Sequence, residues 1–148
     1  MPLIRLEDMA AYFLSVEVKE RVIPLICGSP ARNDFKLAGQ ITDAASSLPS
    51  DISEGYARRN PAEFANFVRY ARASLNEVIE RLPDGVAKGY YRQEEIDDIL
   101  RICYRLSKVL EGLFFSLRRQ AQRRRENRRP PHHKQQPPRQ RKPPPRQA

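Results

Sequence analysis

The sequence predicts an all-α protein: an up-down-up-down four-helix bundle followed by a disordered basic C-terminal tail. Three observations predict this fold. Apolar residues recur at steps of three and four along most of the chain, which is the spacing of one helix face. No segment shows the strict apolar–polar alternation of a half-buried strand. Short breaker stretches separate four helical segments, and short connections favour antiparallel neighbours.

The first predicted helix covers residues 7–27. Pro24 predicts an early stop or a bend in its last turn. Gly28, Ser29 and Pro30 then break the helix, and the loop continues to about Asp34. The apolar stripe that we expect to face the core comprises Met9, Phe13, Val16, Ile23 and Ile26.

The second predicted helix covers residues 35–57. Pro49 lies inside an otherwise helical apolar pattern, which predicts a kink or a tightened turn near Leu48. Gly55 offers a residue that adopts the left-handed conformation at low cost, so we expect it to form the helix exit.

The third predicted helix has the clearest start in the chain. Asn60 is a favourable N-cap, Pro61 suits the first helical position, and Glu63 can complete a capping box. We expect this helix to break near Pro83, although the pattern can be followed as far as Lys88. Its stripe comprises Phe64, Phe67, Val68, Ala71, Leu75, Val78, Ile79 and Leu82.

The fourth predicted helix starts near Arg92. Carboxylates crowd its first turns, and Arg118 and Arg119 lie in its expected last turn, which is the charge order that the helix dipole favours. Its broad apolar stripe suits burial among several helices. The stripe comprises Ile96, Ile99, Leu100, Cys103, Leu106, Leu110, Leu113, Phe114 and Leu117. We therefore expect a bundle domain over residues 1–120 and a disordered Arg/Pro-rich tail over residues 121–148.

The formal net charge of +9 is unevenly distributed. From Arg118 to the end, twelve Lys or Arg stand against one acid, Glu126, which gives +11; residues 1–117 carry −2. The part beyond about Gln122 has no large apolar residue, so burial cannot offset its ordering entropy. Its prolines and like charges favour an extended chain.

Several function classes find no support in the residues. No apolar run is long enough to cross a bilayer, and the N-terminus lacks the pattern of a signal peptide. Cys27 and Cys103 are expected to be reduced core thiols of a cytoplasmic protein rather than a disulfide. The two histidines, His132 and His133, lie in the tail without a scaffold, so we expect no catalytic residue, metal site or cofactor.

The stretch L-P-S-D-I-S-E-G-Y-A-R-R-N-P-A-E-F-A-N-F-V-R-Y-A-R-A-S-L-N-E-V closely resembles the signature of the bacterial four helix bundle proteins, first noted as products of intervening sequences in 23S rRNA genes. Asp51, Ser53, Ala73 and Val78 depart from the usual pattern. The resemblance covers roughly residues 8–118. The matching positions are Pro49, Ser50, Ile52, Glu54, Gly55, Arg58, Glu63, Phe64, Phe67, Ala71, Ser74, Leu75 and Glu77.

The resemblance implies a small four-helix bundle that assembles into a ring-like homopentamer and has no established enzymatic activity. The chain is also similar to the accessory variability determinant of diversity-generating retroelements, a bundle that binds nucleic acid and a reverse transcriptase. The likeness to the intervening-sequence branch is the closer of the two.

Arginines are the candidate nucleic-acid-binding residues, because they neutralise phosphates and release counterions. For the arginines on the bundle, the alternative to phosphate binding is a solvated face of mixed charge. For the tail, the alternative is a chain end that only increases solubility. Glu54 and Arg58 can form an i,i+4 pair that is structural, contacts a ligand or seats a neighbouring subunit. The candidates are Arg118, Arg119, Arg123, Arg124, Arg125, Arg128 and Arg129 near the C-terminus, and Arg58, Arg59, Arg69 and Arg72 on the bundle.

These observations favour a non-enzymatic, oligomeric bundle that binds nucleic acid, RNA ahead of DNA, with poor sequence readout because the tail has no aromatic residue. The alternative is a scaffold that docks a protein partner, for example a reverse transcriptase. A neighbouring reverse transcriptase with template repeats would favour the scaffold, and a location inside an rRNA gene would favour RNA binding.

Overall fold

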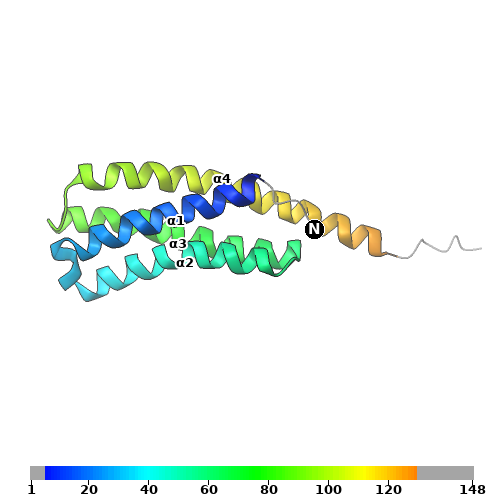
Figure 1. The fold of residues 1–148 in the computed structure, drawn as a ribbon, viewed down its shortest axis with the longest axis horizontal. Coiled ribbons are helices and arrows are strands. Elements are labelled where there is room, and N and C mark those ends of the chain that lie inside the picture. The colour runs from blue at the N-terminus through cyan, green and yellow to red at the C-terminus, as the bar shows by residue number, and fades with distance from the viewer. Residues whose placement is uncertain (1–5, 130–148) are drawn as a thin grey trace, which may run out of the picture.

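The computed structural model describes residues 6–129, with side chains described from residue 10. Four helices make up this part of the chain: α1 (Leu6–Cys27), α2 (Phe35–Ala57), α3 (Pro61–Ala87) and α4 (Gln93–Arg128). A short 3-10 turn, Pro30–Asn33, lies between α1 and α2. The helices alternate in direction, and α4 extends past the corner that joins α2 to α3 (Figure 1). The predicted all-α four-helix fold is confirmed.

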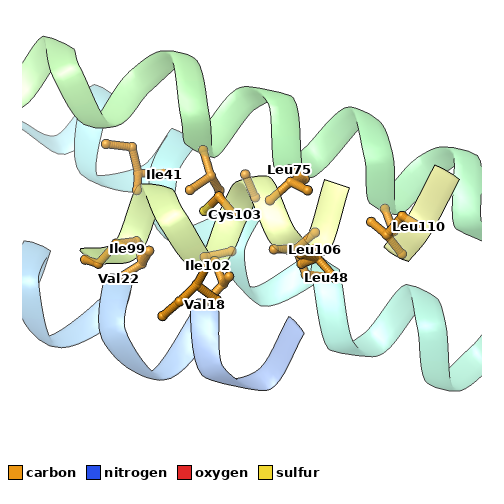
Figure 2. Close-up of a cluster of buried hydrophobic side chains, with 14 of the residues drawn as sticks. Val18, Val22, Ile41, Leu48, Leu75, Ile99, Ile102, Cys103, Leu106 and Leu110 are labelled. Carbon is orange, nitrogen blue, oxygen red and sulfur yellow. The ribbon is translucent and has the colours of Figure 1, made fainter. Parts of the chain in front are cut away.

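The core runs along the axis between the four helices. Each helix packs against the next one in the chain, and α4 closes on α1. Aliphatic side chains fill the centre, where Val18 and Val22 of α1 meet residues of the other three helices (Figure 2). Buried residues of α2, α3 and α4 in this view are Ile41, Leu48, Leu75, Ile99, Ile102, Cys103, Leu106 and Leu110.

The side of α1 that faces the core differs from the predicted one. Phe13 is 61% exposed, and Val16 and Ile23 are only half-buried. The prediction is confirmed for Ile26 but wrong for Phe13, Val16 and Ile23, because α1 is apolar on much of its circumference and two stripes competed. The true stripe contains Ser15, which is fully buried and donates its hydroxyl to the carbonyl of Ala11 at 2.6 Å. The core-facing residues of α1 are Ala11, Ser15, Val18, Val22 and Ile26.

Two loops meet at one end of the bundle and are tied together by Asp34. Its side chain caps α2 by accepting from the backbone N–H of Leu37 at 3.2 Å. The other carboxylate oxygen accepts from the Lys88 ammonium and the Tyr90 hydroxyl, each at 2.9 Å. Because Lys88 and Tyr90 belong to the α3–α4 connection, one carboxylate joins both loops of this end.

Helix α3 continues through Pro83 and ends at Ala87, so the predicted break is wrong. Pro83 is exposed, and Leu82 on the core side is fully buried. On this exposed side, water can bond the carbonyl that the missing proline N–H leaves without a partner, and burial of the neighbouring apolar residues holds the helix together. The exit comes at Gly89, whose φ of 76° lies in the left-handed region.

Helix α4 is longer than expected. It continues to Arg128, so that residues 121–128, assigned to the tail from the sequence, are helical. Leu117 is the last buried residue, and residues 122–129 are all exposed. The predicted tail from residue 130 to 148 lies outside the described residues.

The two cysteines are free, but only Cys103 is a core residue. Burial raises the pKa of its thiol to about 12, which keeps it in the unreactive protonated form. Cys27, at the last position of α1, is exposed, contrary to the expectation of a core thiol. Among the described helices, none has the length and apolar character to cross a membrane.

Candidate nucleic-acid interface

The stretch that carries the family resemblance, residues 48–78, runs from the second half of α2 through the α2–α3 corner into α3. Gly55 is helical and buried there, and the left-handed residue is Arg59, with a φ of 52°. The expected role of Gly55 as the left-handed exit is therefore wrong. A Cβ at position 55 would lie 2.6 Å from Cδ2 of Phe64 and 2.7 Å from Cβ of Phe67. Glycine is required because α3 packs directly against the α2 backbone.

The start of α3 has the predicted N-cap and the predicted proline, but among the described side chains Glu63 does not complete the expected capping box. The Asn60 side chain accepts hydrogen bonds from the backbone N–H groups of Ala62 at 2.9 Å and Glu63 at 3.3 Å. Pro61 occupies the first helical position and is buried. The cap and the close contact at Gly55 together fix the direction in which α3 leaves the corner.

The predicted Glu54–Arg58 pair is present, and the Arg58 guanidinium lies 2.7 Å from the Glu54 carboxylate. Both side chains are about half exposed, so the pair by itself contributes little to stability. The same guanidinium stands 5.3 Å from the centre of the Phe67 ring. Arg58 therefore has two partners, which orient it across the corner.

A row of cations and aromatic rings runs from the corner along α3. The Phe67 ring meets the Tyr70 ring edge to face at 5.8 Å between centroids. Arg69 lies 5.9 Å from the centre of the Tyr70 ring, and Tyr70 is half exposed. The structure thus brings Arg58 and Arg69 together on one surface.

A second group of two arginines and one ring lies between α3 and α4. Arg72 of α3 and Arg118 of α4 approach the Phe114 ring at 5.5 Å and 5.9 Å from its centre. Cation–π attraction of this kind is worth about 0.5–1 kcal/mol at exposed sites. The sequence did not indicate Phe114 as a site residue, because it was counted as part of the core stripe of α4.

Helix α4 then carries the largest concentration of charge beyond the packed part of the bundle. Seven arginines and one glutamate lie between residues 118 and 129, a net charge of +6. In the described part of the chain, side chains 10–129, only Arg58 of the candidate arginines has a carboxylate at ion-pair distance. The single glutamate, Glu126, accepts from the Gln122 side chain at 3.1 Å.

The remaining motif residues have structural surroundings. Pro49 is buried within α2, which is continuous there, and Ser74 and Glu77 are half-buried on α3. Glu63 is exposed in the first turn of α3. Asp51 stands where the related pattern usually has Asn; burial and the nearby charge of Glu54 raise the pKa of its carboxyl.

Comparison with known protein families decides the relationship. Residues 7–112 match the family described as 23S rRNA-intervening sequence protein. The chain belongs to this family. The match covers the four-helix body and ends before the arginine-rich part of α4, so the charged extension lies outside the region shared with the 23S rRNA-intervening sequence protein family. No curated protein matches the chain.

The arginines predicted from the sequence as site residues therefore form three groups. Arg58, Arg59 and Arg69 lie near the α2–α3 corner, and Arg72 joins Arg118 across Phe114. The remaining candidates are exposed and follow the last buried residue of α4: Arg119, Arg123, Arg124, Arg125, Arg128 and Arg129. Within the described residues, no group of three or more His, Cys, Asp or Glu side chains has the arrangement of a metal site.

Proposed function

We propose that this member of the 23S rRNA-intervening sequence protein family is a non-enzymatic, oligomeric bundle that binds RNA electrostatically. The observation that supports the proposal is the end of α4 with its C-cap, residues 118–129, whose seven exposed arginines give a net charge of +6. Arginine binds phosphate oxygens in a planar, two-pronged geometry, and every neutralised phosphate releases counterions. The position of the segment beyond the packed core leaves it open to a large ligand.

RNA is placed ahead of DNA because the family is described by its link to rRNA genes. The binding itself is expected to depend little on sequence. Tyr70 and Phe67 are the aromatic residues beside candidate arginines at the corner, and residues 118–129 contain no aromatic side chain for stacking. Phosphate contacts then set the affinity and leave base identity unread.

The oligomer is supported by large apolar side chains exposed on two neighbouring helices. Phe13 and Tyr12 on α1 and Tyr104 and Phe115 on α4 are each 40% exposed or more. Such side chains on adjacent helices suit an interface between subunits. The homopentamer implied by the family resemblance would place five arginine segments on one particle and multiply weak contacts through effective concentration.

Light scattering on the purified protein tests the assembly. A multiple of 17.2 kDa is expected, with five as the expected subunit number. Phe13→Glu should reduce the particle mass, while Phe35→Glu, at a still more exposed phenylalanine on α2, serves as the control. A monomer at micromolar concentration would contradict the oligomer.

Fluorescence anisotropy with a structured RNA tests the binding. Affinity should fall steeply as salt rises, because each neutralised phosphate adds nearly one unit to the log–log slope. Changing Arg123, Arg124, Arg125, Arg128 and Arg129 to Gln should weaken binding to every sequence alike and flatten the slope by several units. The matched set Arg58, Arg59, Arg69 and Arg72 to Gln should matter less. The reverse ranking would move the site to the bundle.

A scaffold for a protein partner, such as a reverse transcriptase, is the second candidate. The exposed aromatics of α1 favour it, because a partner protein can cover them as well as a second subunit can. Copurification of a partner that is lost in Phe13→Glu, with RNA binding unchanged, would support this role.

A further inference from the structure

The end of α4, residues 118–128, is called the α4 segment below. Its six arginines are distributed around the helix rather than along one face. A helix turns by about 100° per residue, so side chains four or seven residues apart share a side. Arg118 and Arg125 share one side, Arg119 and Arg123 a second, and Arg124 and Arg128 a third. These sides are separated by roughly a third of the circumference.

The third of these sides continues the core stripe of α4. Leu110, Leu113 and Leu117 are buried on it, and Arg124 and Arg128 follow at the corresponding positions further along. An unpaired charge is too costly to bury, so α4 cannot pack another helix there and leaves the bundle. Figure 1 shows α4 continuing past the α2–α3 corner in this way. The arrangement exposes even the side that faced the core.

The first side is continuous with the bundle. Arg118 and Arg72 of α3 both contact the Phe114 ring. Arg72 therefore continues onto the bundle the row of cations formed by Arg118 and Arg125. The segment is therefore anchored to the bundle at Arg118. From residue 118 to residue 128 its length is about 16 Å at 1.5 Å per residue.

We propose, as a deepening of the RNA-binding function above, that the α4 segment inserts as a helix into the major groove of an RNA stem that unpaired nucleotides have widened. Cations on three sides can all meet acceptor atoms only when the ligand surrounds the helix, so that two sides face phosphates and the third faces base edges. A single strand or a flat surface leaves at least one pair of arginines unused. A groove has a phosphate backbone on each side.

The geometry of nucleic acids decides which groove is meant. The major groove of regular A-form RNA is deep and narrow and does not admit a helix, whereas bulges and internal loops interrupt it. The B-form DNA major groove is wide enough for an α-helix, so a DNA duplex is the competing ligand that the experiment must include. The bundle at the base of the segment limits how far the helix enters.

The test separates the helical form of the segment from its charge. Gln122→Pro keeps every arginine and should break the helix near Arg118, because proline clashes with the carbonyl four residues before it. The six residues left beyond it are too few to hold a helix alone. Gln122→Ala is the matched control, since it also removes the contact with Glu126 but keeps the helix. The packed core ends at Leu117, so both full-length variants should retain the wild-type melting temperature.

Anisotropy titrations across salt use four labelled ligands of equal phosphate number: an RNA stem with an internal loop, a perfect RNA duplex, a single strand and a DNA duplex. Wild type and Gln122→Ala should prefer the looped stem, with a log–log salt slope steeper than that for the single strand by about two units or more, one for each additional phosphate. Gln122→Pro should bind all four with the shallower slope.

The outcomes distinguish the two proposals. Salt-dependent binding that is equal for all ligands, or a preference that Gln122→Pro retains, would overturn groove insertion and leave RNA binding by charge intact. Tighter binding to the DNA duplex than to the looped stem would overturn the choice of RNA. Failure of every ligand to bind would overturn the proposed function itself.

Discussion

The phenolic hydroxyl of Tyr91 donates a 2.7 Å hydrogen bond to the backbone carbonyl of Leu82. Tyr91 follows the turn that ends α3, so its ring folds back over the last turns of that helix. The ring lies against Gly85, where a Cβ would overlap the hydroxyl and the ring carbon that bears it. Burial raises the pKa of Tyr91 to about 12, and the hydroxyl stays a donor over the whole physiological range.

Gly85→Ala should therefore lower the free energy of unfolding by about 1–3 kcal/mol, the usual cost of overpacking. The added methyl group displaces the Tyr91 ring from its place on α3. Gly112→Ala is the matched control, because that helical glycine has no neighbouring atom within 4 Å of an added Cβ. There the exchange should stabilise by up to about 1 kcal/mol. Thermal melts followed by circular dichroism measure both, and equal effects would contradict the close contact.

The α2–α3 corner makes the same kind of prediction with a different readout. Gly55→Ala should destabilise by about 1–3 kcal/mol, since its Cβ would collide with Phe64 and Phe67. Gly39→Ala, in the same helix and with open space around it, should not destabilise. A displaced Phe67 would also leave Arg58 without its ring partner and loosen the corner locally. We therefore expect proteases to cut the Gly55 variant at the corner first. Limited proteolysis with mass spectrometry checks the position of the cut.

Acid should weaken the tie between the two loops. Hydrogen bonds from Lys88, Leu37 and Tyr90 lower the pKa of the Asp34 carboxyl from its ordinary value of 3.8. A carboxyl with a lowered folded-state pKa contributes stability above its unfolded pKa, and that contribution is lost as the pH falls through the folded value. The bonds to Asp34 also raise the pKa of Lys88 and of Tyr90, so their share is lost as the pH rises through those raised values.

Asp34→Asn isolates this effect because asparagine remains a good N-cap for α2. Its loss of stability relative to wild type should be constant near neutral pH and should shrink below pH 3.8. Urea unfolding at a series of pH values measures the difference. A difference that grows on acidification would show that the sign is wrong.

Truncation tests where the folded body ends. Of the described residues, a chain that stops after Gln120 loses only the half-buried Ala121 and the exposed residues 122–129, so its melting temperature should equal that of the full chain. The helical signal should fall by no more than the eight residues Ala121–Arg128 contribute. A clear drop in melting temperature would mean that the removed part packs on the bundle.

The local signals in the sequence predicted local structure well. Asn60 and Pro61 mark the start of α3 because capping depends on a few adjacent residues, and the predicted range 35–57 matches α2. Features set by contacts between helices were not predictable from one helix at a time. Gly55 was predicted to be the helix exit because one helix by itself does not reveal the approach of Phe64. Phe13 was assigned to the core because α1 has two apolar stripes.

The candidate site divides in the same way. The arginines were evident from charge alone, whereas their aromatic partners Phe114 and Tyr70 depend on which helix faces which. The length of α4 was underestimated because polar residues after Leu117 give no apolar periodicity. Once a helix is nucleated by packing, however, arginine, glutamine and alanine extend it easily.

The opposite ends of α4 give the molecule a large electric dipole moment. Four exposed carboxylates lie at its beginning, and the arginines of residues 118–128 lie at its far end; the centres of the two groups are about 40 Å apart at 1.5 Å per residue. The carboxylates are Glu94, Glu95, Asp97 and Asp98. In the field of a polyanion this separation produces a torque that turns the subunit arginine end first before any contact forms. The encounter is then pre-oriented, and added salt should slow capture by shortening the range over which the torque acts.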